Sequence, residues 1–317
     1  TGHSNNSLTR EQGSSGGCVT ELLLHLLRTN KVDSVIVTTN TDHGPAPIIT
    51  SDEKEIIRAA QSKYCLSPTN IILNAVLKSG KRFAYVGLPC QIQGLRKAMD
   101  VTPALKSKIP YIIGIFCGFN MTINATHFLV KKSKIVPTDV QEISYRKKLN
   151  GTTGFFIRGS QKNFFVEKHG YTFLNLFYSP KRCLKCYDYT AEFADIAFGD
   201  AWEKGLGWSR IISRTAETDQ LLHDMAQAGR ITLTSSSVTD IANSQKSILS
   251  HKKLDFWIRK NFYKNFPEYN IPVPALNSKQ KLHGNLMTFI LTIAHSKVGL
   301  LLLTILPFDL LQKISKK

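Results

Sequence analysis

The sequence predicts an α/β protein in which mixed sheets with flanking helices form two closely packed subdomains, followed by a helical C-terminal tail. Three observations favour this fold class. Short runs rich in β-branched residues alternate with helical patterns, as in proteins whose parallel strands are covered by helices. Two successive runs each deliver a cysteine, and from residue 251 the composition becomes cationic and aromatic. We therefore divide the chain into subdomains at residues 10–100 and 101–245 and a tail at residues 246–317.

The first elements surround a Ser/Gly-rich loop. Residues 1–15 are polar and are predicted as loop, and residues 21–28 carry leucines at helical spacing. The loop between them, with Gly16 and Gly17, opens this helix and offers free backbone N–H groups to an anion, although it also fits a plain helix cap. Residues 32–39 are a β-branched run and predict a buried strand.

The next elements bring two cysteines to strand ends. Helices are predicted at residues 52–61, capped by Ser51, and at residues 71–77, and strands at residues 83–88 and 110–116. Cys90 then lies between a strand and a helix, where the helix dipole is expected to lower the pKa of its thiol. Cys117 follows the second strand. Because sites in open α/β sheets gather at the carboxyl ends of parallel strands, both cysteines are candidates for one site, although a single cysteine there is usually a packing residue.

The elements from residue 125 to residue 229 contain a basic cluster. A helix is predicted at residues 125–134, followed by β segments at residues 141–145, 154–158 and 164–167. Residues 146–148 (RKK) form either a solvated face or a grip for a phosphate or carboxylate. Strands are also predicted at residues 195–198 and 210–214, and a helix at residues 218–228 that stops at Gly229.

The segment of residues 180–208 carries the strongest chemical signal. Cys183 and Cys186 form a Cys-x-x-Cys pair ahead of the Gly199–Asp200 turn. With Cys90 and Cys117 this pair makes four thiols, which fit an iron–sulfur cluster, a structural zinc ion, or a nucleophile or redox dithiol. The spacing favours the cluster, because zinc sites usually use two paired knuckles and no histidine motif accompanies a nucleophile.

The overall composition limits the partners. The chain has 317 residues, of which 42% are hydrophobic and 20% charged, as in an ordinary globular protein. Lys and Arg number 41 against 23 Asp and Glu, a net charge of +18 that implies a polyanionic partner. The basic residues are spread along the chain without a nucleic-acid-binding motif, so nucleic acid is unlikely to be that partner. Six cysteines without a signal peptide indicate reduced thiols and a cytoplasmic protein.

The tail contains two apolar helical patterns. Leucines and other large apolar residues recur at helical spacing over residues 282–293, and residues 298–306 are apolar all round. This last run is too short to span a bilayer, which takes about 20 residues. An interfacial or partner-docking tail, which would make the protein membrane-peripheral, and a helical hairpin packed on the core remain equal alternatives. The chain ends in a sequence with Lys313, Lys316 and Lys317.

Taken together, several motifs in order resemble the coenzyme F420 hydrogenase/dehydrogenase beta-subunit family. They are residues 15–20 (SGGCVT), 62–64 (SKY), 86–91 (VGLPCQ), 116–118 (FCG), and 183–188 (CLKCYD) followed by 194–202 (ADIAFGDAW). Members are iron–sulfur flavoproteins that carry FAD and at least one [4Fe-4S] cluster. The resemblance therefore implies an oxidoreductase that passes electrons between an iron–sulfur donor and a two-electron acceptor, such as coenzyme F420. The acceptor is then an anionic small molecule, and the donor an acidic ferredoxin or an iron–sulfur partner subunit.

The resemblance also assigns site residues. It implies that the cluster is ligated by Cys90, Cys117, Cys183 and Cys186. It places FAD near Ser15, Gly16, Gly17, Thr20, Ser62, Lys63, Tyr64, Gly199 and Asp200. Lys63 is the expected catalytic residue, because its ammonium group would stabilise an anionic reduced flavin.

Two departures from the family pattern leave alternatives open. The sequence has no ferredoxin-like segment rich in Cys-x-x-Cys, and Cys18 and Cys65 stand inside the flavin-site motifs, where they are packing residues or exchanged ligands. A different class of function is a non-catalytic subunit that carries a cluster or zinc and docks in a larger redox or polysaccharide-synthesis assembly.

Overall fold

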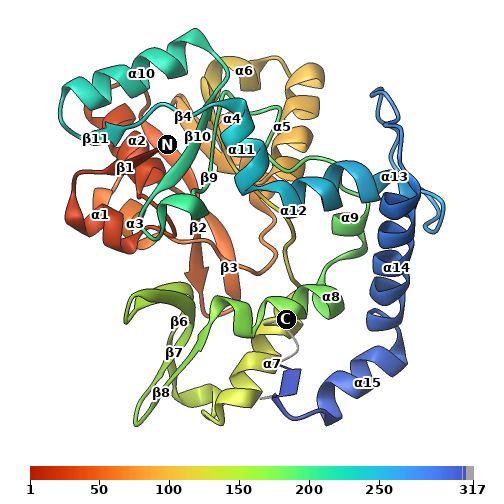
Figure 1. Cartoon of the computed structure of the whole chain (residues 1–317). Helices are drawn as coiled ribbons and strands as arrows, with labels where there is room; N and C mark the ends of the chain where they lie inside the picture. Colours follow the sequence, from red (N-terminus) through yellow and green to blue (C-terminus); the bar gives the residue numbers. More distant parts are fainter. Residues whose placement is uncertain (309, 312–317) are drawn as a thin grey trace.

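The computed structural model describes residues 1–308, 310 and 311, so Lys313, Lys316 and Lys317 lie outside the described residues. Its centre is an eight-stranded mixed sheet (Figure 1). In spatial order its strands are β11 (Ile231–Leu233), β1 (Gly2–Ser4), β10 (Ser209–Ser213), β9 (Ile196–Asp200), β5 (Tyr111–Ile115), β4 (Phe83–Gly87), β2 (Ser34–Thr41) and β3 (Gly44–Thr50). The four strands β9, β5, β4 and β2 run parallel, and antiparallel strands extend the sheet on both sides.

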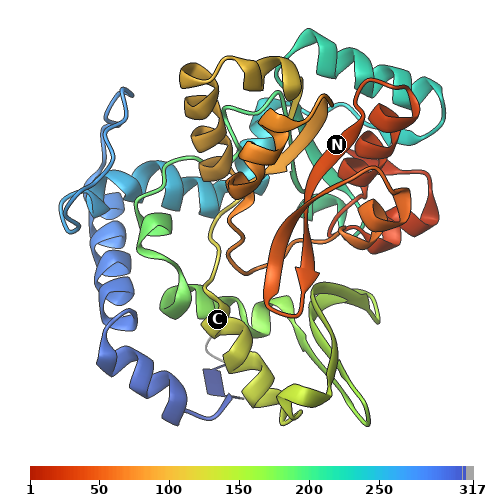
Figure 2. The same ribbon diagram turned by 180° about the vertical axis from the view of Figure 1, so that it is seen from behind.

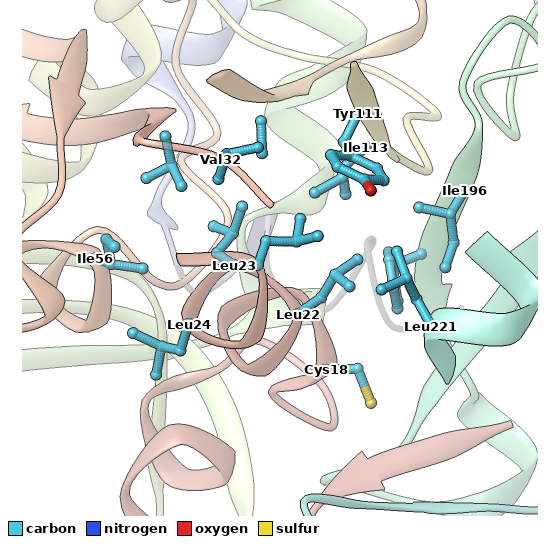
Figure 3. Close-up of a cluster of buried hydrophobic side chains, with 14 of the residues drawn as sticks. Cys18, Leu22, Leu23, Leu24, Val32, Ile56, Tyr111, Ile113, Ile196 and Leu221 are labelled. Atoms are coloured by element: carbon cyan, nitrogen blue, oxygen red, sulfur yellow. The ribbon is translucent and has the colours of Figure 1, made fainter. Parts of the chain in front are cut away.

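Helices cover both faces of this sheet. One face packs against α2 (Cys18–Arg28), α3 (Glu53–Arg58) and α10 (Ala216–Gln227), and the short α1 (Ser7–Gln12) packs beside α2. Figure 3 shows the leucines of α2 against the strand residues of this core. The other face packs against α4 (Leu73–Lys78), α5 (Pro89–Val101) and α6 (Ala104–Lys108). The strands are buried on both sides because their β-branched and aromatic residues meet helices on each face.

A smaller lobe lies beside the sheet. It contains the antiparallel sheet of β6 (Val140–Leu149), β7 (Thr152–Gly159) and β8 (Asn163–Glu167), with α7 (Ile123–Ser133) packed against it. Two short helices, α8 (Asn175–Tyr178) and α9 (Lys181–Leu184), lead the chain back to the large sheet. Figures 1 and 2 show the lobe below the sheet from both sides.

The C-terminal tail is mainly helical, with an irregular stretch at residues 260–277. Its helices are α11 (Val238–Ser244), α12 (Lys246–Leu249), a π-helical turn (Ser250–Leu254), α13 (Asp255–Arg259), α14 (Ser278–Ala294) and α15 (Lys297–Ile305). The end of the tail reaches the core of the small lobe, where Leu303 and Leu311 are buried beside Phe128. The predicted fold class, an α/β protein with flanking helices and a helical tail, is confirmed.

Three local predictions are wrong, and strands at the edges of the large sheet were not predicted. Residues 1–15 are not loop, because β1 and α1 form there and β1 pairs with both β10 and β11. The edge strand β3 was not predicted. Asp52, and not Ser51, caps α3 by accepting from the amide of Lys54. The basic cluster of residues 146–148 lies inside β6 instead of following it.

The predicted boundary between residues 100 and 101 falls inside the large sheet. The strands on its two sides, β4 and β5, are hydrogen-bonded parallel neighbours. The second sheet, by contrast, comprises only strands between residues 140 and 167. The division into residues 10–100 and 101–245 therefore stays a prediction.

Gly114 of β5 is predicted to be a packing-critical glycine. A Cβ atom there would lie 2.4 Å from the Cβ of Ala191 and 2.9 Å from that of Ala194, so one segment must shift. We predict that Gly114→Ala lowers the free energy of unfolding in urea by about 1–3 kcal/mol. Gly80→Ala is the matched control, because a Cβ atom there meets no atom within 4 Å; its effect should stay within about 0.5 kcal/mol, or stabilise slightly. Equal losses in the two variants would contradict this packing argument.

Candidate functional site

A cavity of about 540 Å³ opens at the carboxyl ends of the four parallel strands. Each of these strands contributes to the wall: Thr38 lies within β2, Gly87 ends β4, Cys117 follows β5 and Gly199 lies near the end of β9. The small lobe supplies the opposite wall, which includes Lys168. This is the edge at which open α/β sheets bind their ligands.

The Ser/Gly loop brings the amino end of α2 to this cavity. Gly17 has a φ of 77°, and a Cβ atom there would lie 2.5 Å from the carbonyl oxygen of Thr9. Gly16 packs as tightly and donates its amide to Ser209 Oγ at 2.9 Å, but it does not line the cavity itself. Ser15 and Thr20 do line it. Only glycine fits this turn, and the turn leaves the first amides of α2, which have no partner within the helix, at the cavity wall.

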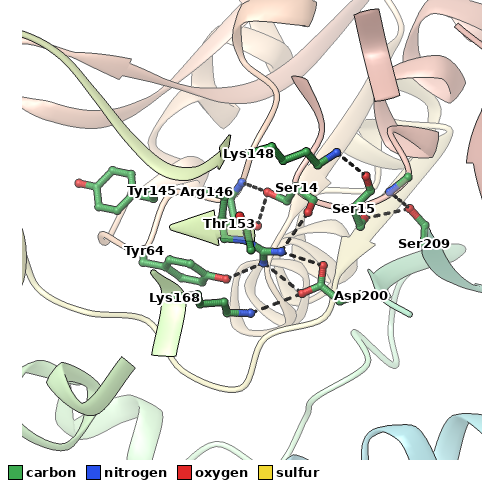
Figure 4. Close-up of polar contacts among 12 residues, drawn as sticks. Ser14, Ser15, Tyr64, Tyr145, Arg146, Lys148, Thr153, Lys168, Asp200 and Ser209 are labelled. Carbon is green, nitrogen blue, oxygen red and sulfur yellow. Dashed lines mark hydrogen bonds and ion pairs between the residues drawn. The ribbon is translucent and has the colours of Figure 1, made fainter. Parts of the chain in front are cut away.

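A buried arginine organises the cavity's polar side (Figure 4). Arg146 is 1% exposed and bridges the lobe to the sheet. Its two terminal nitrogens contact the two carboxylate oxygens of Asp200 at 3.1 and 3.3 Å. It also donates to the hydroxyl of Tyr64 at 3.0 Å and to the carbonyl oxygen of Ser14 at 2.9 Å. Burial alone lowers the pKa of Arg146, but Tyr64 and Asp200 raise it above its ordinary value, so the guanidinium stays charged.

A local irregularity of β6 turns Arg146 inward. The pairing of β6 with β7 shifts register between Ser144 and Lys147, and the residues from 144 to 146 are all buried. Such β-bulges re-aim side chains near functional sites. Lys148, farther along the strand, donates to the carbonyl oxygens of Arg10 and Ser15 at 2.6 and 3.1 Å. Arg146 and Lys148 of the basic cluster therefore bind a carboxylate and backbone carbonyl oxygens of the chain itself.

Two lysines face the cavity. Lys63 donates from Nζ to the carbonyl oxygens of Ala60 and Gln61 at 2.7 and 3.0 Å, and to that of Ala59. Burial lowers the pKa of Lys63 to about 7, whereas the three carbonyl acceptors favour its ammonium form. Lys168 lies 4.0 Å from the centre of the Trp202 ring and 3.6 Å from a carboxylate oxygen of Asp200. The cavity thus combines apolar walls with cationic groups.

The four cysteines predicted as cluster ligands lie in one region beside this cavity. Cys117 lines the cavity, Cys90 lies in the first turn of α5, and the pair Cys183 and Cys186 lies in and after α9. Although part of Cys90 reaches solvent, burial, together with the nearby thiols of Cys186 and Cys183, raises its pKa to about 11. The predicted lowering of the Cys90 pKa by the helix dipole is therefore wrong, because desolvation outweighs it. In the described part of the chain, no three His, Cys, Asp or Glu side chains are grouped around one metal-ion position.

Lys252 completes this region and was not predicted. It lies in the π-helical turn and is 1% exposed. Its Nζ lies 5.2 Å from the centre of the Phe119 ring. Its positive charge opposes the rise that burial imposes on the thiol pKa values of Cys90, Cys117 and Cys183. Within residues 1–308, 310 and 311 no carboxylate forms an ion pair with Lys252. Burying a cation without a carboxylate partner costs free energy, so a negatively charged group in this region would stabilise Lys252.

Two residues of the site, Lys168 and Lys252, were not predicted from the sequence. Both are single lysines without a motif, and their roles depend on the fold.

Cys18 and Cys65 are buried in separate hydrophobic clusters, with exposed fractions of 1% and 4%. Burial raises the pKa of both thiols, as expected of packing residues.

Comparisons with known proteins agree with these motifs. Residues 1–74 match the family described as the coenzyme F420 hydrogenase/dehydrogenase beta subunit, N-term, and residues 80–238 match its C terminus. The chain is 28% identical over 224 residues to the coenzyme F420-dependent sulfite reductase of Methanocaldococcus jannaschii, which covers 66% of this chain and 34% of that protein. It is 27% identical over 230 residues to the coenzyme F420 hydrogenase subunit beta of Methanococcus voltae, covering 69% of this chain and 77% of that subunit.

The chain therefore spans only about a third of the sulfite reductase. Its fold is also similar to a chain in the F420-reducing [NiFe] hydrogenase complex from Methanosarcina barkeri, with a TM-score of 0.65 and 20% identity. That similarity covers 85% of this chain and 94% of the other. Both parts of the family match in order, across the large sheet and the residues of its cavity, and the predicted resemblance is confirmed. This chain belongs to the coenzyme F420 hydrogenase/dehydrogenase beta-subunit family.

Proposed function

We propose that this chain is an iron–sulfur flavoprotein oxidoreductase that passes electrons between an iron–sulfur partner and a two-electron acceptor such as coenzyme F420. FAD occupies the cavity, and a [4Fe-4S] cluster is ligated by Cys90, Cys117, Cys183 and Cys186. One observation carries the proposal. The wall of a single cavity contains residues from all three flavin-site motifs together with Cys117. A cofactor bound there would lie beside a cluster ligand.

The chemistry of the cavity fits FAD. Its volume is within the range of about 300–1,000 Å³ typical of cofactor sites. The amino end of α2 suits the pyrophosphate, and Gly17 adds no side chain to the cavity wall there. Lys63 and Lys168 provide positive charge for an anionic reduced ring. Tyr64 and Asp200 are held in place by Arg146, so the polar wall is pre-organised.

The donor set fits an iron–sulfur cluster better than a single ion. In a cubane cluster each cysteine binds a different iron, so the four sulfurs do not converge on one point. Four thiols in one region without a single-ion position are consistent with this requirement. A cluster with four thiolate ligands is an anion, and Lys252 is the buried cation that would face it.

The two cofactors would supply the exchange between single electrons and electron pairs. The chain's own residues would do the rest. The apolar walls would exclude water from the ring, Lys63 would hold positive charge beside it, and Lys252 would hold positive charge beside the thiolates. The net charge of +18 would attract an acidic donor subunit or an anionic acceptor. The names of the hydrogenase relatives, which are subunits, support a partner of this kind.

The first prediction from the proposed function concerns cofactor content. Purified without oxygen, the chain should contain about four irons and four sulfides per FAD, with the combined absorption of a flavin and a cluster. The measurement is an anaerobic spectrum with metal, sulfide and flavin assays. Zinc without flavin would overturn the proposal and favour the non-catalytic docking subunit.

The second prediction concerns Lys252. Replacing it by methionine removes a unit charge near the thiolates. Lys252→Met should therefore lower the reduction potential of the cluster by roughly 50–100 mV, the one-electron effect of a charge about 7–14 Å away at an effective dielectric constant near 20. The potential is measured by redox titration followed by electron paramagnetic resonance. Lys253→Met is the control, because Lys253 instead pairs with Glu192. An unchanged potential in Lys252→Met would refute this role.

The third prediction concerns Arg146. In Arg146→Met, Lys168 is the one cationic partner left to Asp200 among the described residues, and Tyr64 loses its donor. We expect a loss of about 2–4 kcal/mol in the free energy of unfolding and weaker retention of FAD on gel filtration. Lys147→Met, at the neighbouring half-buried residue that contacts Phe156, is the control and should retain the flavin. Full flavin occupancy in Arg146→Met would contradict the role of Arg146 as the organiser of this wall.

A further inference from the structure

The last two helices of the tail each carry exposed apolar residues at helical spacing. We call these residues the tail face: Leu282, Leu286, Phe289, Ile290 and Ile293 of α14, and Val298, Leu301, Leu302 and Ile305 of α15. Their exposed fractions reach 71% at Leu282 and 67% at Ile305. Figures 1 and 2 both show α14 and α15 along the edge of the molecule. Large apolar patches on a monomer usually mark an interaction site.

The tail face is fixed outward by the way α14 packs. The inner side of α14 consists of Gly284, Thr288, Leu291 and Ala294, all buried. A Cβ atom at residue 284 would lie 2.2 Å from Ile258 Cδ1 of α13, so any larger residue there would displace the Ile258 side chain. A surface helix normally turns its large apolar residues inward. Here small residues mediate most of the internal contact, and rotating the helix would drive large side chains into α13.

The chain segment that carries the tail face has only positive charges. Residues 269–308 contain no Asp or Glu. Lys279 and Lys281 lie exposed near the start of α14, and Lys297 lies exposed at the start of α15. This combination of an apolar face with neighbouring lysines complements a surface that is apolar inside and anionic outside.

We propose that the tail face docks this protein on an anionic phospholipid membrane, with α14 and α15 lying in the interface. Among the described residues no single helix is long and apolar enough to cross a membrane; α14 and α15 meet that test only as a pair, and this pair is bent by 75°. A helix pair of this kind lies on a bilayer more readily than through it. A protein partner is less favoured, because the exposed set contains no Trp, Tyr or Arg, the residues in which protein interfaces are enriched.

The test is flotation of the full-length protein with vesicles of phosphatidylcholine, with or without phosphatidylglycerol. The protein should float with the anionic vesicles, and increasing salt should weaken this binding. Leu286→Glu combined with Phe289→Glu should reduce the vesicle partition coefficient by at least about tenfold. Val101→Glu combined with Val238→Glu is the matched control, because both valines are 82% exposed and lie outside the tail face. The control should stay within about twofold of the original protein.

A second variant tests the electrostatic part without touching apolar packing. Replacing Lys279, Lys281 and Lys297 by glutamine should weaken binding by roughly fivefold for each lysine. Thermal unfolding of every variant checks that it is folded, and none of these readouts depends on a bound cofactor. Failure of the original protein to bind anionic vesicles would overturn the proposal, as would equal loss in the valine control. A dimer that the Leu286/Phe289 variant dissociates in the absence of vesicles would assign the tail face to a second copy of this chain, and would also overturn it.

Discussion

The pairing of Arg146 with Asp200 is the constraint on which the cavity depends. A guanidinium with 1% exposure is expensive to desolvate, and the expense is offset only when nearly all its donors are used. Here the donors reach the end of β9 at Asp200, the loop at Tyr64, the loop at Ser14 and, at 3.3 Å, the hydroxyl of Thr153 in β7. One side chain thereby sets the relative positions of the sheet, two loops and the small lobe.

Close packing at the ends of the parallel strands is a second constraint on the site. Gly199 lies against the ring of Phe116, and a Cβ atom at residue 199 would be 2.2 Å from that ring. Phe116 in turn donates its amide to the carbonyl of Phe198 and precedes Cys117. The position of Cys117 at the cavity wall is therefore coupled to the Gly199–Asp200 turn, which Arg146 holds from the other side. Charge and packing define the same corner of the site.

The sequence predicts the central sheet well and its edges poorly. The β-branched runs of β2, β4 and β5 have strong local signals, because strands buried on both faces need such residues. The edge strand β3 contains Pro45 and Pro47, which look like loop residues but are tolerated at an edge that needs fewer ladder donors. The strand β1 is short and polar, and its strand conformation comes from pairing with β10 and β11, which lie more than 200 positions away in the chain.

The site residues divide in the same way. The cysteines and the Gly16–Gly17 turn lie in local sequence motifs, so they can be predicted as site residues from those motifs and their spacing. Arg146 cannot, because a run of three basic residues usually marks a solvated face and the bulge that turns it inward depends on pairing with β7. Lys252 also cannot be predicted locally, since its neighbours along the chain give no sign that three of the cysteines, Cys90, Cys117 and Cys183, lie near it in space.

Lys252 links the tail to the chemistry of the family region. The family match ends at residue 238, whereas Lys252 and Arg259 lie beyond it. Arg259 is fully buried and donates to the carbonyl oxygen of Leu184, between the two cysteines of the Cys-x-x-Cys pair, at 2.7 Å. The first part of the tail thus both supports the thiol region and contributes its buried charge. Because α13, which contains Arg259, also packs against the inner side of α14, the same short helix supports the cysteine pair and the helix that bears the tail face.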